Sequence, residues 1–166
     1  MDSYDGRSIP KEMTTEPIRQ VWQDGKREQL VADYLATANG WEFYKTPRYY
    51  FVDYLVNKLK PNGYANYIGG VEVKWMRSHA ATEVKFPYQK LQRMWLTEPL
   101  DDNPDAYNRI VIRYTDALLV IPARLLRNIA PTYGLTRADT QEHDFNVHFI
   151  ATEDFADYLE PIVISE

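Results

Sequence analysis

The sequence contains no cysteine, which excludes disulfide bonds and thiolate metal sites. It contains no apolar run near the roughly 18 residues that a membrane-spanning helix requires. The segment from Met1 to Gly6 lacks the basic and apolar regions of a signal peptide. These absences predict a protein of the cytoplasm that has no membrane partner.

Several common catalytic and binding motifs are also missing. Gly69-Gly70 is not followed by the lysine and helix of a phosphate-binding loop, and there is no nucleophile elbow. The histidines, His79, His143 and His148, do not have the spacing of metal ligands. The sequence therefore gives no reason to expect a phosphate loop, an elbow-type serine hydrolase or a histidine metal centre.

The chain lacks the positive net charge of many nucleic-acid-binding proteins, because its 19 basic residues are outnumbered by 24 acidic ones. A nucleic-acid contact would therefore depend on a local basic patch or on metal ions. Besides Lys74, the basic residues between residues 45 and 95 are Arg48, Lys58, Lys60, Arg77, Lys85, Lys90 and Arg93. We expect any nucleic-acid face to lie in this middle part of the chain.

The 166 residues contain enough apolar material for one core, with 45% hydrophobic and 14% aromatic residues. Residues 1–14 are polar and aperiodic, which predicts a flexible N-terminal tail followed by a single domain over residues 15–166. Thr15-Glu16-Pro17 predicts a helix start and Asn39-Gly40 its end, with an interruption at Asp24-Gly25. The later predicted elements are strands at 41–45, 49–56, 67–76 and 84–88, a helix at 88–97, strands at 109–114 and 117–121, a helix at 122–129, a strand at 145–150 and a helix at 153–159.

This order predicts an α/β fold of the mixed α+β kind, in which helices flank a central mixed β-sheet. The turn at residues 58–63 predicts a hairpin, so part of the sheet is expected to be antiparallel. Asp53 interrupts an otherwise apolar strand on one side of that hairpin. If the two strands pair, Asp53 can reach the face that carries Glu72.

Glu72 and Lys74 share one face of their predicted strand, because side chains two residues apart point the same way. Val71, Val73 and Trp75 form an apolar opposite face. Paired carboxylates suit Mg²⁺, which lowers the pKa of water and neutralises phosphate charge. A neighbouring lysine can orient the attacking water, so the set predicts phosphodiester hydrolysis.

The pattern Asp53 … Glu72-Val73-Lys74 resembles the PD-(D/E)XK nuclease superfamily, which includes restriction-enzyme-like, resolvase-like and phage nucleases. Val52 stands where the family signature has proline. The resemblance covers roughly residues 25–130 and implies a restriction-endonuclease-like core. It also implies that Asp53 and Glu72 bind Mg²⁺, with Mn²⁺ as a substitute, and that Lys74 activates or positions the attacking water.

The resemblance extends to two flanking helices. Glu28, on the edge of the apolar face of the first helix, matches a family glutamate that assists metal binding. Gln89, Lys90 and Gln92 open the helix after the motif strands and match a family glutamine or lysine. The resemblance therefore adds Glu28 to the metal ligands and Gln89 to the catalytic residues, with Lys90 or Gln92 as alternatives in contact with the substrate phosphate.

A second Glu-x-Lys pattern occurs at Glu83-Val84-Lys85. Its predicted strand is short and ends at Pro87, which is typical of a sheet edge. The Glu72–Lys74 strand is longer and directly follows the Asp53 strand through one hairpin. We therefore place the site at Glu72 and Lys74.

These observations predict a Mg²⁺-dependent deoxyribonuclease; DNA is favoured as the substrate, although the sequence itself does not separate DNA from RNA or endo- from exonucleolytic cleavage. The small size favours a stand-alone enzyme such as a phage nuclease acting in the host cytoplasm. A homodimer would help it to engage duplex or branched DNA, although the sequence itself does not show one. Two alternatives stay open: a non-catalytic interaction or nucleic-acid-binding module with the nuclease fold, and a different metal-dependent enzyme on a similar sheet.

Overall fold

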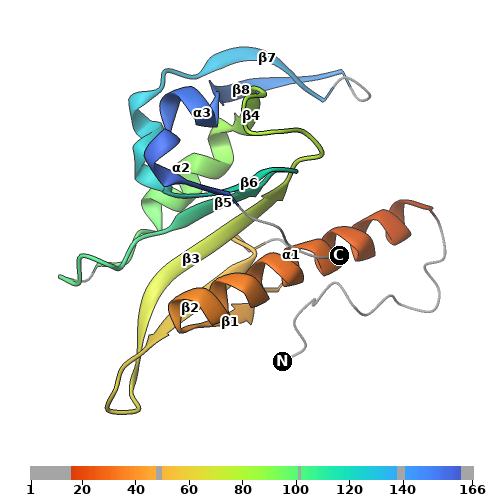
Figure 1. The fold of residues 1–166 in the computed structure, drawn as a ribbon. Helices are drawn as coiled ribbons and strands as arrows, with labels where there is room; N and C mark the ends of the chain where they lie inside the picture. Colours follow the sequence, from red (N-terminus) through yellow and green to blue (C-terminus); the bar gives the residue numbers. More distant parts are fainter. Residues whose placement is uncertain (1–15, 48–49, 101, 138–140, 162–166) are drawn as a thin grey trace.

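A computed structural model describes residues 16–47, 50–100, 102–137 and 141–161 of the chain (Figure 1). The predicted flexible tail at residues 1–14 lies outside the described residues. Among the described residues, no helix is both long and apolar enough to cross a membrane.

The chain contains helices and strands in a mixed order. The elements in order are α1 (Glu16–Asn39), β1 (Trp41–Lys45), β2 (Tyr54–Leu59), β3 (Ala65–Trp75), β4 (Val84–Pro87), α2 (Tyr88–Leu96), β5 (Arg109–Arg113), β6 (Ala117–Pro122), the 3₁₀ helix η1 (Ala123–Asn128), β7 (Thr132–Arg137), β8 (Glu142–Phe149), α3 (Ala151–Asp154), the 3₁₀ helix η2 (Ala156–Tyr158) and β9 (Leu159–Pro161).

The strands form two sheets. The larger sheet has the order β1-β2-β3-β5-β6-β9, and the smaller one has the order β4-β8-β7. In the larger sheet β3 and β5 run parallel, while the other neighbouring strands are antiparallel. The protein is thus a mixed α/β protein with a mixed multistranded sheet, and the predicted fold class is confirmed at this level.

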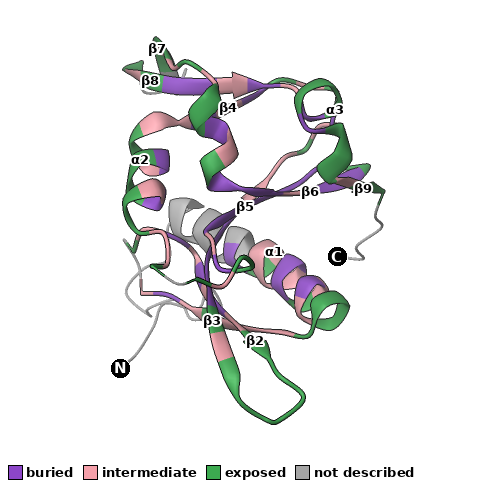
Figure 2. Cartoon of the chain, turned by 90° about the vertical axis from the view of Figure 1, so that its left-hand side faces the viewer, coloured by how far each residue is buried: buried purple, intermediate pink, exposed green. Residues whose placement is uncertain are grey.

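The larger sheet separates two cores. On one face, Val31 and Leu35 of α1 pack against β-sheet residues that include Val71 and Val111. On the other face, Leu91 of α2 packs in a cluster that also contains residues of β5, β6 and β8. Helix α2 lies between the two sheets, whereas the hairpin tip between β2 and β3 projects beyond both cores and is exposed (Figures 1 and 2). Strand β3 can therefore present apolar residues to α1 and polar residues toward α2.

Helix α1 is unbroken at Gly25, although an interruption was predicted there. One glycine inside a helix costs about 1 kcal/mol. Packing of the apolar stripe that includes Val31 and Leu35 offsets this cost, and Gly25 itself is buried.

Strand β2 begins at Tyr54, so the predicted strand at 49–56 is wrong at its start. The preceding residues instead fold back as a loop: the amide of Tyr50 donates to the Pro47 carbonyl, and the Thr46 hydroxyl donates to the Asp53 carbonyl at 2.9 Å. Val52 is buried in the core beside α2. Tertiary packing has overridden the β propensity of the aromatic run.

Two differences occur near the C-terminus. The helix predicted at 153–159 consists of the short α3 and η2, followed by β9. Strand β7, for which nothing was predicted, pairs with β8 across the small sheet. Strand β9 is held by β6, which is distant in the sequence, so the local pattern carries little signal for it.

Candidate active site

Strand β3 presents its two faces as the alternation predicts. Val71 and Val73 are buried in the core beneath α1. Glu72 and Lys74 therefore point to the opposite face, toward α2 and the small sheet. Glu72 is only 6% exposed, which is exceptional for a glutamate and requires compensation of its charge.

Asp53 lies opposite Glu72 because β2 and β3 pair with Tyr54 against Val71. The amide of Asp53 donates to the Val71 carbonyl at 3.1 Å, which continues the pairing one residue beyond β2. The amide of Val73 donates to Asp53 Oδ2 at 2.8 Å. Two backbone contacts thus fix this carboxylate beside Glu72, as the hairpin predicted.

The two carboxyl groups strongly influence each other. Burial, followed by the charge of Asp53, raises the pKa of Glu72 well above its ordinary value, although Lys90 opposes the shift. A protonated Glu72 can donate a hydrogen bond to Asp53. When Glu72 is ionised, its buried Oε2 receives no hydrogen bond from any described residue. This orphaned oxygen marks a place for a cation or a proton.

Lys90 supplies the positive charge that the pair requires. Its ammonium lies 2.6 Å from Glu72 Oε1. Burial lowers the pKa of Lys90, but the charges of Glu72, Asp53 and Glu28 outweigh this effect and leave the pKa above its ordinary value. The Lys90 side chain is also 41% exposed, so the same ammonium can meet a ligand that arrives from solvent.

Helix α2 explains why Lys90, rather than Gln89, meets Glu72. Lys90 lies four residues before the buried Met94 and so shares the inward side of the helix. Gln89 is exposed and lies three and four residues before Gln92 and Arg93, which are also exposed. Gln89, the accessory residue preferred from the sequence, is exposed beside Lys90 and lines the same cavity. Helical periodicity is the signal that could have favoured Lys90 as the partner of Glu72.

The position of α2 is fixed by a buried asparagine that the sequence did not single out. Asn108 is fully buried and precedes β5. Its amide nitrogen Nδ2 donates to the Met94 carbonyl at 2.7 Å, and its Oδ1 accepts from the Gly70 amide at 2.8 Å. Asn108 thereby ties the end of α2 to the strand that carries Glu72.

Lys74 lies on the Glu72 face of β3, two residues further along the strand. Its ammonium donates to the Lys85 carbonyl in β4 at 3.3 Å. The second Glu-x-Lys pattern lies at β4 and contacts the small sheet. Glu83 pairs with His148 at 3.0 Å, and the Lys85 ammonium donates to the Leu135 carbonyl. The structure thus brings Asp53 to Glu72 and not to Glu83.

Glu28, the third predicted metal ligand, lies on α1. Its carboxylate forms an ion pair with Lys45 at 2.8 Å, and the Lys45 ammonium lies 4.9 Å from the Tyr54 ring centroid. Among the described residues, no group of three or more histidine, aspartate or glutamate side chains is arranged to hold a metal. Glu28 is thus engaged with Lys45, although its charge also acts on Lys90 beside the carboxylate pair, and its role as a metal ligand stays a prediction.

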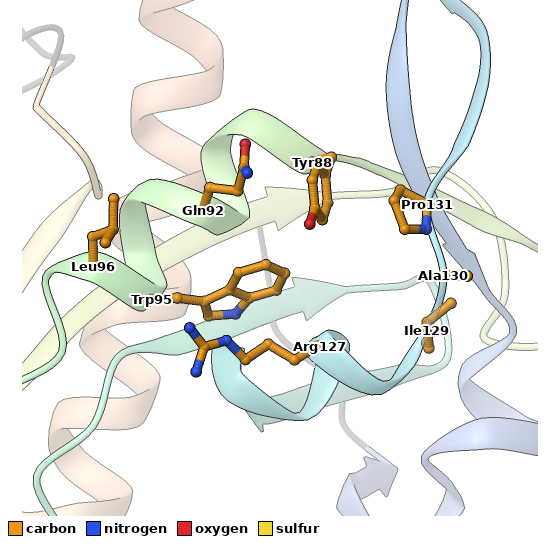
Figure 3. A pocket seen from close by; sticks show the side chains of 8 residues that line it. All are labelled: Tyr88, Gln92, Trp95, Leu96, Arg127, Ile129, Ala130 and Pro131. Atoms are coloured by element: carbon orange, nitrogen blue, oxygen red, sulfur yellow. The ribbon is translucent and has the colours of Figure 1, made fainter.

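Two cavities border α2. One of about 290 Å³ opens beside the carboxylate pair and is lined by Tyr50, Phe51, Pro87, Gln89, Lys90, Arg93 and Asp144. The other, of about 420 Å³, lies between α2, η1 and the segment before β7; Trp95 and Tyr88 line it together with Arg127 (Figure 3). No carboxylate lines the second cavity, so it cannot provide carboxylate metal ligands. The cavity beside Lys90 is the one that gives solvent species access to the predicted site.

A hard divalent cation fits the carboxylate pair. Asp53 and Glu72 supply oxygen ligands from adjacent, well-anchored backbone positions, and Oε2 of Glu72 has an unused lone pair. Mg²⁺ is commonly held by one or two carboxylates, with water and phosphate oxygens completing its shell. The raised pKa of Glu72 makes binding depend on pH, because a cation must displace the proton that this carboxyl favours.

Comparisons with known proteins supply no independent assignment. No family model matches the chain, and neither a curated protein nor a solved structure matches it. The functional argument therefore rests on the residues of this chain.

Proposed function

We propose that the chain is a metal-dependent nuclease of the PD-(D/E)XK kind, with a restriction-endonuclease-like core, that hydrolyses phosphodiester bonds in DNA. The observation that carries the proposal is the buried Glu72 with its orphaned oxygen, held against Asp53 and compensated by Lys90. Burying a carboxylate beside a second one destabilises a fold. Such an arrangement is common where perturbed pKa values serve binding or catalysis.

In this proposal Asp53 and Glu72 hold Mg²⁺ or Mn²⁺. The bound ion would lower the pKa of water and neutralise charge on the phosphate under attack. Lys74, on the same face of β3, positions or activates the attacking water. Lys90 stabilises charge on the phosphate from the exposed side of the pair, a role for which Gln89 was the first choice. Glu28 supports the site through its ion pair with Lys45 rather than as a metal ligand.

The test is cleavage of linear, nicked, branched and single-stranded DNA and of RNA, with Mg²⁺ or Mn²⁺. We expect E72Q and K74A to lose on the order of 10²-fold or more of the wild-type rate, because each removes a group that acts on the reacting atoms. K90A should also lose activity, whereas Q89A should retain most of it.

The second Glu-x-Lys pattern provides matched controls. E83Q and K85A make the same chemical changes on β4, where Glu83 pairs with His148, and should leave cleavage within a few-fold of wild type. Circular dichroism must show that each variant is folded. Absence of cleavage by the wild type, or equal cleavage by E72Q and E83Q, would refute the site.

One observation favours the alternative, a non-catalytic module that keeps the fold. Lys90 already neutralises Glu72, as a structural ion pair would, and Glu28 is paired with Lys45. The two functions differ in their response to divalent ions. A nuclease site should raise the unfolding midpoint in Mg²⁺ or Mn²⁺ for the wild type but not for E72A, whereas a module needs no such response.

A further inference from the structure

A third cavity, of about 400 Å³, lies at the end of β3 and β5, on the far side of the sheet from Lys74. Its lining is Arg27, Trp75, Met76, Arg77, Arg113, Tyr114 and Thr115. Three of these residues are arginines and none is acidic, in a protein whose formal net charge is −5. The cavity is therefore a local concentration of positive charge.

Arg113 is the unusual member of this lining. It is 6% exposed, although arginine is seldom buried without an anionic partner. Its Nε is buried and donates to no described acceptor, and its Nη1 reaches the Ala117 carbonyl only at 3.4 Å. No described carboxylate lies within ion-pair distance of it. A buried guanidinium with unused donors is unfavourable unless a ligand completes it.

The neighbouring groups orient the arginines. The guanidinium groups of Arg27 and Arg113 each lie 5.5 Å from the Trp75 ring centroid, so the indole holds both by cation–π contact. Arg77 follows β3 and is exposed at the same cavity. Planar guanidinium groups bind phosphate with paired, charge-assisted hydrogen bonds.

We propose that this cavity binds a phosphate group, with Arg113 as the buried anchor and Arg77 as the exposed contact. The phosphate can belong to a nucleic-acid strand or to a free nucleotide, since both present negatively charged non-bridging oxygens that accept hydrogen bonds from guanidinium groups. The inference is independent of the proposed nuclease activity, because it uses neither the carboxylate pair nor a metal.

The experiment measures thermal unfolding of the full chain in inorganic phosphate against chloride at equal ionic strength, with no divalent ion present. We expect a saturable rise in the midpoint for wild type. R113Q and R77Q should each raise the phosphate concentration at half-saturation by about tenfold, because each loses charge-assisted hydrogen bonds to the phosphate. Phosphate also stabilises proteins in general, because this salt is excluded from protein surfaces. That effect is the same for every variant, so it cancels when the midpoints of two variants are compared.

R124Q is the matched control, because Arg124 is an exposed arginine on η1 outside the cavity. If R113Q does not fold, R77Q still tests the proposal, because it changes an exposed arginine of the same cavity. Competition by a single-stranded oligonucleotide identifies a strand phosphate as the ligand, whereas competition by a nucleoside monophosphate alone identifies a free nucleotide. An equal response in wild type, R77Q and R124Q would overturn the proposal, and it would do so whether or not the protein cleaves DNA.

Discussion

The carboxyl group of Glu72 is subject to opposing effects on its pKa. Its burial and the neighbouring Asp53 favour the protonated form, whereas Lys90 favours the ionised form. A cation between the carboxylates would act in the same direction as Lys90 and more strongly. A proton, the Lys90 ammonium and a metal ion would therefore compete for the Glu72 carboxyl group. The fraction of Glu72 that is protonated at a given pH is the quantity to measure.

E72Q is predicted to stabilise the metal-free protein increasingly as pH rises. The folded-state pKa of Glu72 lies above its unfolded value, so its contribution to stability is complete below the unfolded pKa and is lost as pH rises toward the folded pKa. Glutamine does not titrate and avoids that loss. Urea unfolding should show the stability of E72Q relative to wild type rising as pH increases above the pKa of an unfolded-state glutamate.

E160Q is a control for this pH series, because Glu160 is exposed on β9 and its replacement removes the same charge. The stability difference between E72Q and wild type should change more with pH than the difference between E160Q and wild type. A difference for E72Q that is flat with pH would show that Glu72 ionises normally in the folded protein.

At the scale of elements, β3 owes its position to two consecutive glycines. Gly69 has φ +114°, and a Cβ there would lie 2.2 Å from the Tyr107 carbonyl oxygen. A Cβ on Gly70 would lie 2.6 Å from the Val52 side chain. These contacts let the segment before β5 and the loop before β2 approach the strand that carries Glu72.

G69A is predicted to destabilise the fold by about 3 kcal/mol or more, since both the backbone conformation and the space oppose a side chain. G134A is the matched control: a Cβ at Gly134 meets nothing within 4 Å. Urea unfolding of both variants measures the difference. Equal stability of G69A and wild type would mean that β3 and the Tyr107 segment are not packed as described.

Local patterns predicted best the elements whose buried side chains recur at the helical or strand period. Helix α2 has Leu91 and Met94 on one side, and β3 alternates Val71 and Val73 with Glu72. The start of β2 was wrong because long-range packing holds Val52 in a loop. Asp53 and Glu72 were paired correctly from one hairpin, but the ion pair of Glu28 with Lys45 depends on how α1 packs on the sheet, and no local pattern in the sequence encodes this.

At the scale of the whole molecule, charge limits how DNA can bind. The net charge of −5 opposes a polyanion at long range, so affinity must come from few, localised contacts. Around the carboxylate pair, Lys90 and Arg93 line one cavity, and Lys74 lies on the adjacent strand face. A small number of phosphate contacts implies a shallow dependence of binding on salt.

We expect the logarithm of the DNA-binding constant to fall against the logarithm of salt concentration with a slope of about −3, because roughly three phosphates are neutralised. Binding is measured by fluorescence anisotropy with the E72Q variant and without divalent ions, so that no cleavage interferes. Adding R93Q should reduce the slope by about 1. K60Q changes an exposed lysine at the hairpin tip and should leave the slope unchanged. If K60Q instead reduces the slope and R93Q does not, DNA lies along the hairpin rather than across α2, and the cavity beside Lys90 is not the entrance to the site.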